Sequence, residues 1–366
     1  LKQLIHLIII VGLTFSCKPQ KERIISENSS NSILNLRDEP ILIDSIDSFL
    51  VYKMKEMQIP GISLVIINDG EVVYHLTKGF ADKEQNKQVT NTTLFEGAST
   101  SKSLFAYLVM FLVEEKKLDL DVPLYQYLAS DLRENYNYDK RYEQITARMV
   151  LSHTTGFPNW RGKSELTINF EPGTNFSYSG EGYQFLVKAC ESILDTDYLG
   201  LESYFQEKVA IPLGLKHTKF VQDNYTIKNK AFPYNNGDKM QQNHWTAEEF
   251  NAASAVHTEA QEFSKWLIAL MNKEGLSKES HEQLFEDQIT VADAPTLLTE
   301  EGAIAWTLGF AKYNISDWVV YGHEGNNDGF NALFLMDREK KWAMVQFNNA
   351  NEVYDFGFEL FKYINK

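Results

Sequence analysis

The sequence predicts a mixed α/β domain, of the α+β kind, in which one antiparallel sheet is built from both ends of the chain. Two strand-like runs, Ile62–Asn68 and Glu71–Lys78, lie near the N-terminus, and further strand-like runs lie between Trp306 and Asn348. Helical patterns fill most of the chain between them, which predicts a mostly helical subdomain over roughly residues 119–257. Because helices pack against the apolar faces of such sheets, we expect one domain over residues 41–366.

The first 40 residues are typical of a targeting segment. Lys2 precedes the apolar run Leu4–Leu13, which is too short to span a bilayer comfortably, so residues 1–16 are expected to be a signal peptide. A small residue precedes Cys17 and the chain turns polar directly after it, so Cys17 is the expected lipidation site. Residues 17–40, rich in Ser, Asn and charge, are expected to form a tether. These features predict an exported bacterial lipoprotein that a lipid anchor holds at a membrane, facing the periplasm or the cell surface.

Local patterns predict the first elements of the domain. Apolar residues recur on one helical face over Ile41–Met57, and Pro60-Gly61 ends this amphipathic helix. Asp69-Gly70, between the first two strands, is a strong signal for a two-residue hairpin. A further helix follows Ser99. Because Leu104–Val113 is apolar on almost every side, we expect this helix to be buried.

The remaining elements alternate between helices, turns and strands. Helices are expected after Pro123 and over Ile145–Leu151, Phe176–Leu186, Leu201–Ile211, Thr258–Met271 and Val353–Ile364, the fifth of them opened by a capping pair, Thr258 with Gln261. Turns are expected at Glu171-Pro172-Gly173 and at Asn235–Asp238. The C-terminal strands are expected at Trp306–Tyr313, Trp318–Tyr321, Phe330–Asp337 and Lys341–Asn348.

Composition excludes several classes of function. The formal charge of −15, with no basic cluster, argues against a nucleic acid or an anionic membrane surface as partner. The histidines are scattered and no His-Glu-x-x-His or Cys/His cluster occurs, so no metal or other cofactor is expected. Cys190 lies in an apolar helical pattern and is expected to be a buried small hydrophobic residue. A Cys17–Cys190 disulfide is a weak alternative to lipidation.

A serine and a lysine stand one helical turn apart at the start of the buried helix. Positions i and i+3 are neighbours on a helix, so the Lys102 amine can lie beside the Ser99 hydroxyl. A charge at the buried end of an apolar helix is costly unless something uses it. Ser-x-x-Lys alone also fits an ordinary capped helix, because it specifies only two residues. With further motifs beside it, the pattern indicates a serine nucleophile paired with a lysine.

Five short stretches, in this order along the chain, resemble the serine β-lactamase and penicillin-binding-protein superfamily. They are Pro60–Ser63, Ser99–Lys102, Leu151–Gly156, Pro172–Ser179 and His323–Gly325. The chain looks most like the class C, D-aminopeptidase and family VIII esterase branch, from about Ile59 to Phe361. The resemblance implies a β-lactamase/transpeptidase-like fold.

The resemblance also implies an acyl-enzyme mechanism. Ser99 would be the nucleophile that attacks a carbonyl group. Its proton would pass either to Tyr178, acting as a phenolate, or to Lys102, acting as a neutral amine. Either base needs a strongly lowered pKa, and the sequence leaves the two alternatives open.

Residues of the last motif are expected to border the cleft. By resemblance, the backbone N–H groups of Ser99 and Asn326 form the oxyanion hole, and Gly325 allows close approach of the substrate. His323 stands where other branches carry the lysine of Lys-Thr-Gly, and it would bind a substrate carboxylate or shuttle protons. His153 is expected to fix a turn rather than to do chemistry.

Two departures from the family pattern bear on the substrate. Gly180 stands where many members carry the asparagine of Tyr-x-Asn, and Ala253-Ser254-Ala255 replaces a glycine pair. We therefore expect an exported serine hydrolase that cleaves an ester, an amide or a D-amino-acid peptide bond in a small-molecule or peptide substrate. The alternatives are a true β-lactamase or DD-carboxypeptidase, and a non-catalytic penicillin-recognising binding protein.

Overall fold

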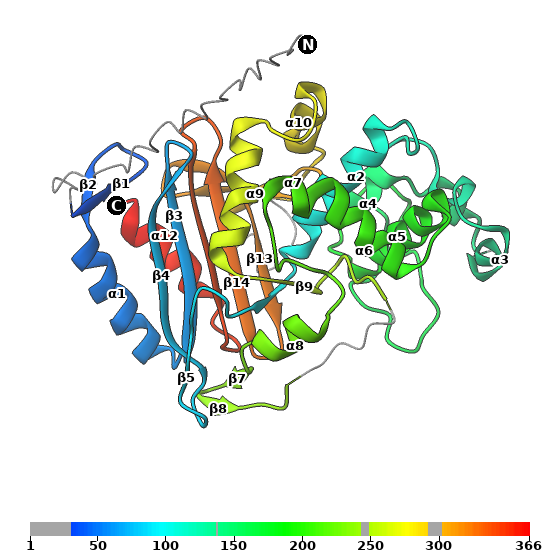
Figure 1. Ribbon diagram of the computed structural model, residues 1–366. Helices are drawn as coiled ribbons and strands as arrows, with labels where there is room; N and C mark the ends of the chain where they lie inside the picture. The colour runs from blue at the N-terminus through cyan, green and yellow to red at the C-terminus, as the bar shows by residue number, and fades with distance from the viewer. Residues whose placement is uncertain (1–30, 137, 243–248, 292–301) are drawn as a thin grey trace, which may run out of the picture. The chain divides into compact units, whose positions relative to one another are not determined.

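The computed structural model describes residues 31–136, 138–242, 249–291 and 302–366 (Figure 1). The expected signal peptide, the lipidation site Cys17 and most of the expected tether lie outside the described residues. Within the described residues no helix is both long and apolar enough to cross a membrane.

One antiparallel sheet forms the centre of the fold. Its strand order is β10-β11-β12-β13-β14-β15-β3-β4-β5, so the N-terminal strand β3 pairs directly with the C-terminal strand β15. The strands are β3 (Gly61–Asn68), β4 (Glu71–Asp82), β5 (Lys87–Gln88), β10 (Ile289–Thr290), β11 (Ala303–Trp306), β12 (Ala311–Ile315), β13 (Trp318–Asn327), β14 (Phe330–Asp337) and β15 (Trp342–Asn348). The predicted sheet built from both ends of the chain is confirmed.

Helices cover both faces of this sheet (Figure 1). On one face, α1 (Ile43–Glu56) and α12 (Asp355–Ile364) bury Ile46, Leu50 and Phe361 against it. On the other face, α9 (Ala260–Asn272) packs on β3 and β15, and its Phe263 contacts Phe334 and Phe347. The two faces therefore carry two separate apolar cores, and the predicted fold class is confirmed.

Helix α2 (Ser101–Glu114) lies in the larger core, beneath α9 and beside the helical part of the chain. Its residues from Ser101 to Met110 are all buried, which confirms the buried helix expected from its apolar sequence. The helix begins two residues later than Ser99, so Ser99 lies in the preceding turn.

Helices and short helical turns dominate the described chain between α2 and α9. They are α3 (Ser130–Arg133), α4 (Ala147–Leu151), α5 (Gly180–Leu194), α6 (Tyr198–Phe205), α7 (Ile211–Leu213) and α8 (Asn224–Asn229), with 3-10 turns at Leu124–Gln126, Glu134–Tyr136 and Lys140–Gln144 and a π turn at Gln206–Ala210. Helix α10 (Lys278–Phe285) follows α9. The helix expected over Leu201–Ile211 lies within a continuous helical run, Tyr198–Leu213, that contains the π turn. The helix expected over Phe176–Leu186 begins only at Gly180, where Ser179 caps it.

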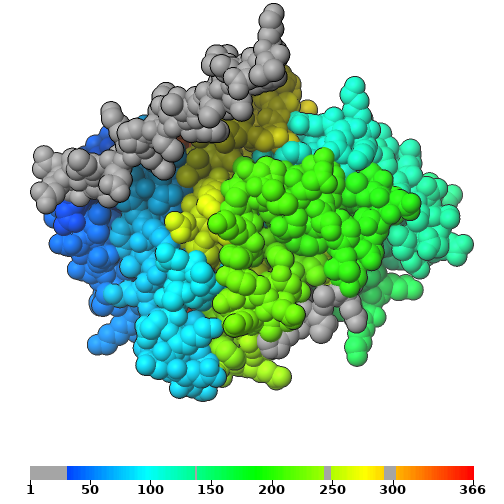
Figure 2. Space-filling model, in the orientation of Figure 1, coloured from blue at the N-terminus to red at the C-terminus, as the bar shows by residue number. Residues whose placement is uncertain are grey.

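All three predicted turns are confirmed, with Gly173 at φ 84° in the turn that begins at Glu171. Asp69 and Gly70 have φ angles of 49° and 73° between β3 and β4, and Asn236 and Gly237 have 49° and 79° between β7 (Tyr234–Asn235) and β8 (Asp238–Lys239). The two hairpins meet, because Lys239 forms an ion pair with Asp82 at 2.8 Å. Figure 2 shows this region as the cyan and yellow-green surface at the lower edge of the molecule.

The expected tether, residues 17–40, overlaps the folded domain at its C-terminal end. Residues 32–42 form the strand pair β1 (Ser32–Leu34) and β2 (Pro40–Leu42), and Leu36 is fully buried. The Leu36 N–H donates to Asn365 Oδ1 at 2.8 Å, beside α12. Apolar residues spaced through a polar stretch therefore attach this segment to the domain.

Two other local predictions are wrong. The expected strand Trp306–Tyr313 is two strands, because Gly309, with φ 87°, turns the chain between β11 and β12 and donates to Leu151 O at 2.9 Å. Helix α9 is capped by Glu259, whose carboxylate accepts from two backbone N–H groups, and not by Thr258. Thr258 instead ends β9 (Val256–Thr258), which pairs with β6 (Phe95–Ala98). Cys190 is buried with a free thiol, as expected.

Candidate active site

Ser99 lies in a tight turn between β6 and α2. Ala98, directly before it, has φ 46°, a left-handed conformation that costs a residue with a side chain about 1 kcal/mol or more. Hydrogen bonds hold this turn: Ser101 Oγ donates to Ala98 O at 2.5 Å, and Thr100 Oγ1 donates to Gly97 O at 2.8 Å. The strained turn at Ala98, held by these two hydrogen bonds, places the Ser99 hydroxyl at the wall of a cavity.

Lys102 lies one turn along α2 and is 1% exposed. Its Nζ is 3.1 Å from Ser99 Oγ and donates to Ala253 O at 2.7 Å. Burial lowers the pKa of this amine well below its usual value of 10.5. A neutral amine has a lone pair, so Lys102 can accept the hydroxyl proton of Ser99.

Tyr178 lies beside Lys102, whose Nζ is 4.7 Å from the centre of the tyrosine ring. Burial raises the pKa of Tyr178 far above 10, although a hydrogen bond with the Ser99 side chain opposes the shift. The neutral phenol is therefore the dominant form. Of the two bases that the sequence leaves open, these pKa directions favour Lys102.

His153 supports the Tyr178 ring. The two ring centres are 4.3 Å apart. His153 has φ 58°, its Nδ1 accepts from the Ser179 N–H at 3.0 Å, and its carbonyl accepts from the Ser177 N–H at 2.8 Å. These bonds confirm the expected role in fixing a turn.

His323 lies on β13, with its ring centre 6.0 Å from that of Tyr178. It is 1% exposed, and its Nδ1 donates to Glu324 O at 2.6 Å. Burial, and then the nearby Lys102, lower its pKa to about 3, so the imidazole is neutral at pH 7. A neutral, buried ring does not favour the expected carboxylate-binding role. Proton shuttling stays a prediction.

Strand β13 passes directly against the Ser99 turn at Gly325. A Cβ atom there would lie 2.4 Å from Gly97 O and 3.0 Å from Ser99 N, so only glycine allows this approach. Asn326 follows and lines the cavity, and its Oδ1 accepts from Asn331 Nδ2 at 2.8 Å. The structure thus brings both residues expected at the oxyanion hole to one place.

The cavity beside Ser99 has a volume of about 660 Å³. Of the predicted residues, Ser99, Lys102, Asn326 and Ser254 line it. Sequence reasoning missed the other lining residues, which are Glu96, Asn159, Trp160, Met240, Gln241, Gln242, Asn327 and Asp328. Glu96, Asn159, Trp160, Asn327 and Asp328 lie within four residues of a motif, whereas the sequence carried no signal for the segment at 240–242.

A buried ion pair borders this cavity. Glu96 and Lys230 are 2% and 1% exposed and are in direct contact. Glu96 also accepts from Asn327 Nδ2 at 2.5 Å, and the same Nδ2 donates to Ser254 O at 3.2 Å. The ion pair thus orients the side-chain amide of Asn327, a residue of β13 that lines the cavity.

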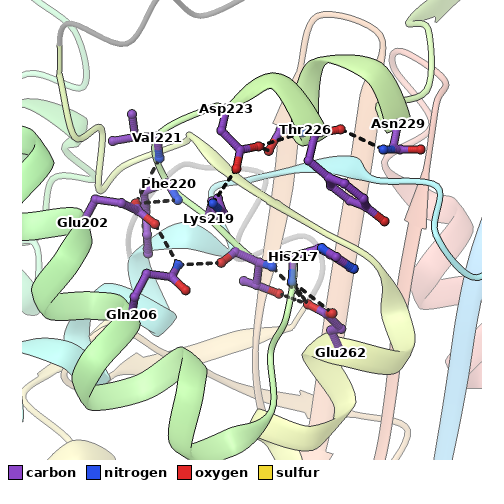
Figure 3. Close-up of polar contacts among 12 residues, drawn as sticks. Glu202, Gln206, His217, Lys219, Phe220, Val221, Asp223, Thr226, Asn229 and Glu262 are labelled. Carbon is purple, nitrogen blue, oxygen red and sulfur yellow. Dashed lines mark hydrogen bonds and ion pairs between the residues drawn. The ribbon is translucent and has the colours of Figure 1, made fainter.

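Two buried carboxylates hold the backbone of the segment His217–Val221 (Figure 3). Glu202 of α6 accepts from the backbone of Phe220-Val221, at 3.0 Å each, and Glu262 of α9 accepts from the backbone of His217-Thr218. Lys219, in the middle of this segment, forms a β-bridge with His257 of β9. Strand β9 in turn pairs with β6, the strand that precedes Ser99. Burial raises the pKa of Glu202 to about 7.

The described residues contain no group of three or more His, Cys, Asp and Glu side chains that could hold a metal ion.

Known proteins resemble this chain in sequence and in fold. A family model described as Beta-lactamase matches residues 46–364. "Protein flp" of Staphylococcus aureus (strain MW2) is 23% identical over 337 residues, which cover 84% of this chain and 63% of that protein. The chain thus spans less than two thirds of the length of this curated relative.

Solved structures show the same fold. A penicillin-binding protein homologue from Pyrococcus abyssi superposes with a TM-score of 0.74 at 24% identity, covering 88% of this chain and 77% of that one. The D-amino acid amidase from Ochrobactrum anthropi SV3 superposes with a TM-score of 0.73 at 20% identity, covering 88% and 97%.

Proposed function

Because the chain belongs to the β-lactamase family, we propose that it is a serine hydrolase working through an acyl-enzyme on Ser99. The observation that carries this proposal is the 3.1 Å approach of a buried Lys102 Nζ to Ser99 Oγ at the wall of the cavity. The D-amino acid amidase that shares the fold supports hydrolysis of this general kind.

In acylation, Ser99 Oγ forms a bond to the substrate carbonyl carbon while its proton passes to the neutral Lys102 amine. The leaving alcohol or amine takes that proton as its bond to the carbonyl carbon breaks. In deacylation, water attacks the acyl carbon and gives a proton to Lys102, which returns it to Oγ as the acid leaves. Tyr178 stays a phenol and hydrogen-bonds the Ser99 side chain during these transfers.

The developing oxyanion would accept from the backbone N–H groups of Ser99 and Asn326. One such donor is typically worth about 3 kcal/mol at the transition state. The close packing of Gly325 on the Ser99 turn supports this assignment, because it places the backbone of β13 directly beside the backbone of that turn.

The charges around the cavity support a substrate without a carboxylate. Among the described residues that line it, Lys102 is the one with a basic side chain, whereas Glu96 and Asp328 are acidic. Burial disfavours the cationic form of Lys102, and the nearby His323 imidazole is neutral. A substrate carboxylate would therefore lack a strong cationic partner. We propose a neutral ester or amide, in preference to a β-lactam or a DD-peptide.

The test is labelling with a fluorophosphonate probe, followed by mass spectrometry of the labelled peptide. We expect the label on Ser99, turnover of a p-nitrophenyl ester, and loss of both in Ser99→Ala. A wild-type protein that is folded but unlabelled would reject the hydrolase. If it also binds a fluorescent penicillin without turnover, the non-catalytic binding protein is correct, and rapid nitrocefin hydrolysis would instead indicate a β-lactamase.

We also propose that the protein is exported and carries a lipid on Cys17. The apolar run Leu4–Leu13 and the small residue before Cys17 support this proposal. Growth of the expressing bacterium with an alkyne fatty acid should label the wild-type protein and not Cys17→Ala. Equal labelling of both would contradict it.

A further inference from the structure

A row of side-chain amides crosses three strands of the sheet and ends beside the cavity. It runs from Asn348 and Gln346 on β15, through Asn331 on β14, to Asn326 on β13. In the strand pairing, Asn331 lies directly opposite Asn326 on one side and Asn348 on the other. Asn331 is 2% exposed, and Gln346 and Asn348 are fully buried. The row therefore connects the interior of the sheet with a residue of the cavity wall.

These amides lie on a face of the sheet that is otherwise apolar nearby. Leu333 and Leu335 follow Asn331 on the same face of β14, and both belong to the core that α1 and α12 cover. Moving an amide from water into such a core is unfavourable unless its polar atoms find partners. Because apolar side chains could fill this space without that cost, the row indicates a role beyond packing.

The hydrogen bonds give the row one direction. At its far end the Ala350 N–H donates to Asn348 Oδ1 at 3.1 Å. Asn348 Nδ2 and Gln346 Nε2 then donate to Asn331 Oδ1 at 3.2 and 2.8 Å. Asn331 Nδ2 in turn donates to Asn326 Oδ1 at 2.8 Å. Because a backbone N–H can only donate, it determines how each amide is turned, and the Asn326 side chain is held in one orientation.

A second set of bonds holds the next residue from the opposite face. Successive side chains of a strand point to opposite faces, and Asn327 Nδ2 donates to Glu96 Oε2 at 2.5 Å and to Ser254 O at 3.2 Å. Asn326 and Asn327 are the last two residues of β13, and the ends of elements open most easily. Bonds on both faces therefore fix the backbone around the Asn326 N–H.

We propose that Asn331, Gln346 and Asn348 are positioning residues for the oxyanion hole, an inference that rests on the hydrolase function proposed above. They act through Asn326, whose side chain bonds Asn331 and whose backbone N–H is the proposed oxyanion donor. Such a donor is effective only at hydrogen-bond distance from the place that the oxyanion will occupy, so a small displacement of the end of β13 lowers the rate. The bound ester does not yet carry that charge, so its binding depends less on the row.

Two substitutions break the row at the same bond. Asn326→Ala removes the acceptor and keeps the backbone N–H. Asn331→Leu removes the donor at similar volume, while Asn348 Nδ2 still donates to Gln346 Oε1 at 2.9 Å. For p-nitrophenyl acetate, we expect each variant to lower kcat about tenfold and to keep KM within about threefold of wild type. The inhibition constant of phenylboronic acid, which forms a tetrahedral adduct with a serine hydroxyl, should rise about tenfold in both.

The double variant tests whether Asn331 acts through Asn326. Both substitutions break one bond, so the kcat of the double variant should lie within about threefold of that of Asn326→Ala. Losses that multiply would overturn the inference, because the two residues would then act separately. An unchanged kcat and inhibition constant in Asn331→Leu would also overturn it. Asn331→Ser provides the same test if the leucine variant does not fold.

Asn365→Ala is the matched control. Asn365 is 1% exposed, follows α12, and accepts from the Leu36 N–H at 2.8 Å, but it does not line the cavity. Its loss should lower the melting temperature, as the loss of Asn331 does, and change neither kcat nor the inhibition constant. An equal fall of kcat in Asn365→Ala would reduce the effect of Asn331→Leu to general stability and overturn the inference alone. No turnover of any ester by the wild-type protein would overturn the hydrolase function, and the inference with it.

Discussion

Replacing Lys102 by methionine should separate the activity of this protein from its stability. The side chain is 1% exposed, and its amine contacts Ser99 Oγ and Ala253 O. Methionine has a similar length and no charge, so it can occupy the same space without a desolvation cost. The substitution therefore removes the proposed base and leaves the packing of α2 intact.

The structure sets the expected magnitudes. Loss of a general base lowers the rate by about 10²–10⁴-fold, or roughly 3–5 kcal/mol at the transition state. For stability, leaving Ala253 O without its donor costs about 1–3 kcal/mol. Burial of the methionine thioether and methyl group, in place of an amine, offsets about 1–2 kcal/mol of that. We therefore expect the free energy of unfolding of Lys102→Met to stay within about 2 kcal/mol of wild type.

The assay combines kcat/KM for a p-nitrophenyl ester with urea unfolding of the same preparations. Lys278→Met, at a lysine whose side chain is 70% exposed, is the matched control and should change neither quantity. A Lys102→Met protein that keeps more than a tenth of the wild-type rate would refute Lys102 as the base. A loss of more than 4 kcal/mol in stability would show that the lysine is mainly structural.

Three further substitutions test other parts of the site. Tyr178→Phe removes the hydroxyl that bonds the Ser99 side chain and keeps the ring on its neighbours, so kcat/KM should fall about 10–100-fold; an unchanged rate would exclude this hydroxyl from proton transfer. Gly325→Val places a side chain against the Ser99 turn and should abolish fluorophosphonate labelling, and retained labelling would contradict the close approach. Glu202→Gln tests a stability that depends on pH. The pKa of Glu202 is raised from 4.5 to about 7 on folding, so its contribution is full below pH 4.5 and lost as the pH rises through 7. In urea unfolding, wild type should lose roughly 2–3 kcal/mol more than the variant between pH 5 and pH 8, and equal losses would contradict the shifted pKa.

Local patterns predicted much of the fold. Helix α2 was recognisable because its apolar residues occur on every side, and the Asp69-Gly70 turn because both positions need positive φ angles. Predictions failed where a distant contact decided the local structure. Gly309 breaks an apparently continuous strand because its Cα packs closely on α2, where a Cβ would lie 2.5 Å from Ala106 Cβ. Thr258 does not cap α9 because its backbone is paired with β6.

The sequence alone determined the nucleophile candidate and its closest partner. The spacing of Ser99 and Lys102 guarantees that they are neighbours wherever the chain between them is helical or nearly so. The resemblance then added Tyr178, His323 and Asn326, and the tertiary structure places all three near Ser99 or in the cavity beside it.

Only the tertiary structure decided the charge on these groups and the shape of the cavity. The pKa values of Lys102, Tyr178 and His323 are shifted chiefly by burial, and the segments that bury them come from distant parts of the chain. Likewise, no pattern near Gly180 indicates that Trp160, twenty residues earlier, fills the space beside it. Sequence patterns record periodicity and local bonding, whereas desolvation and cavity walls depend on which distant segments the fold brings together.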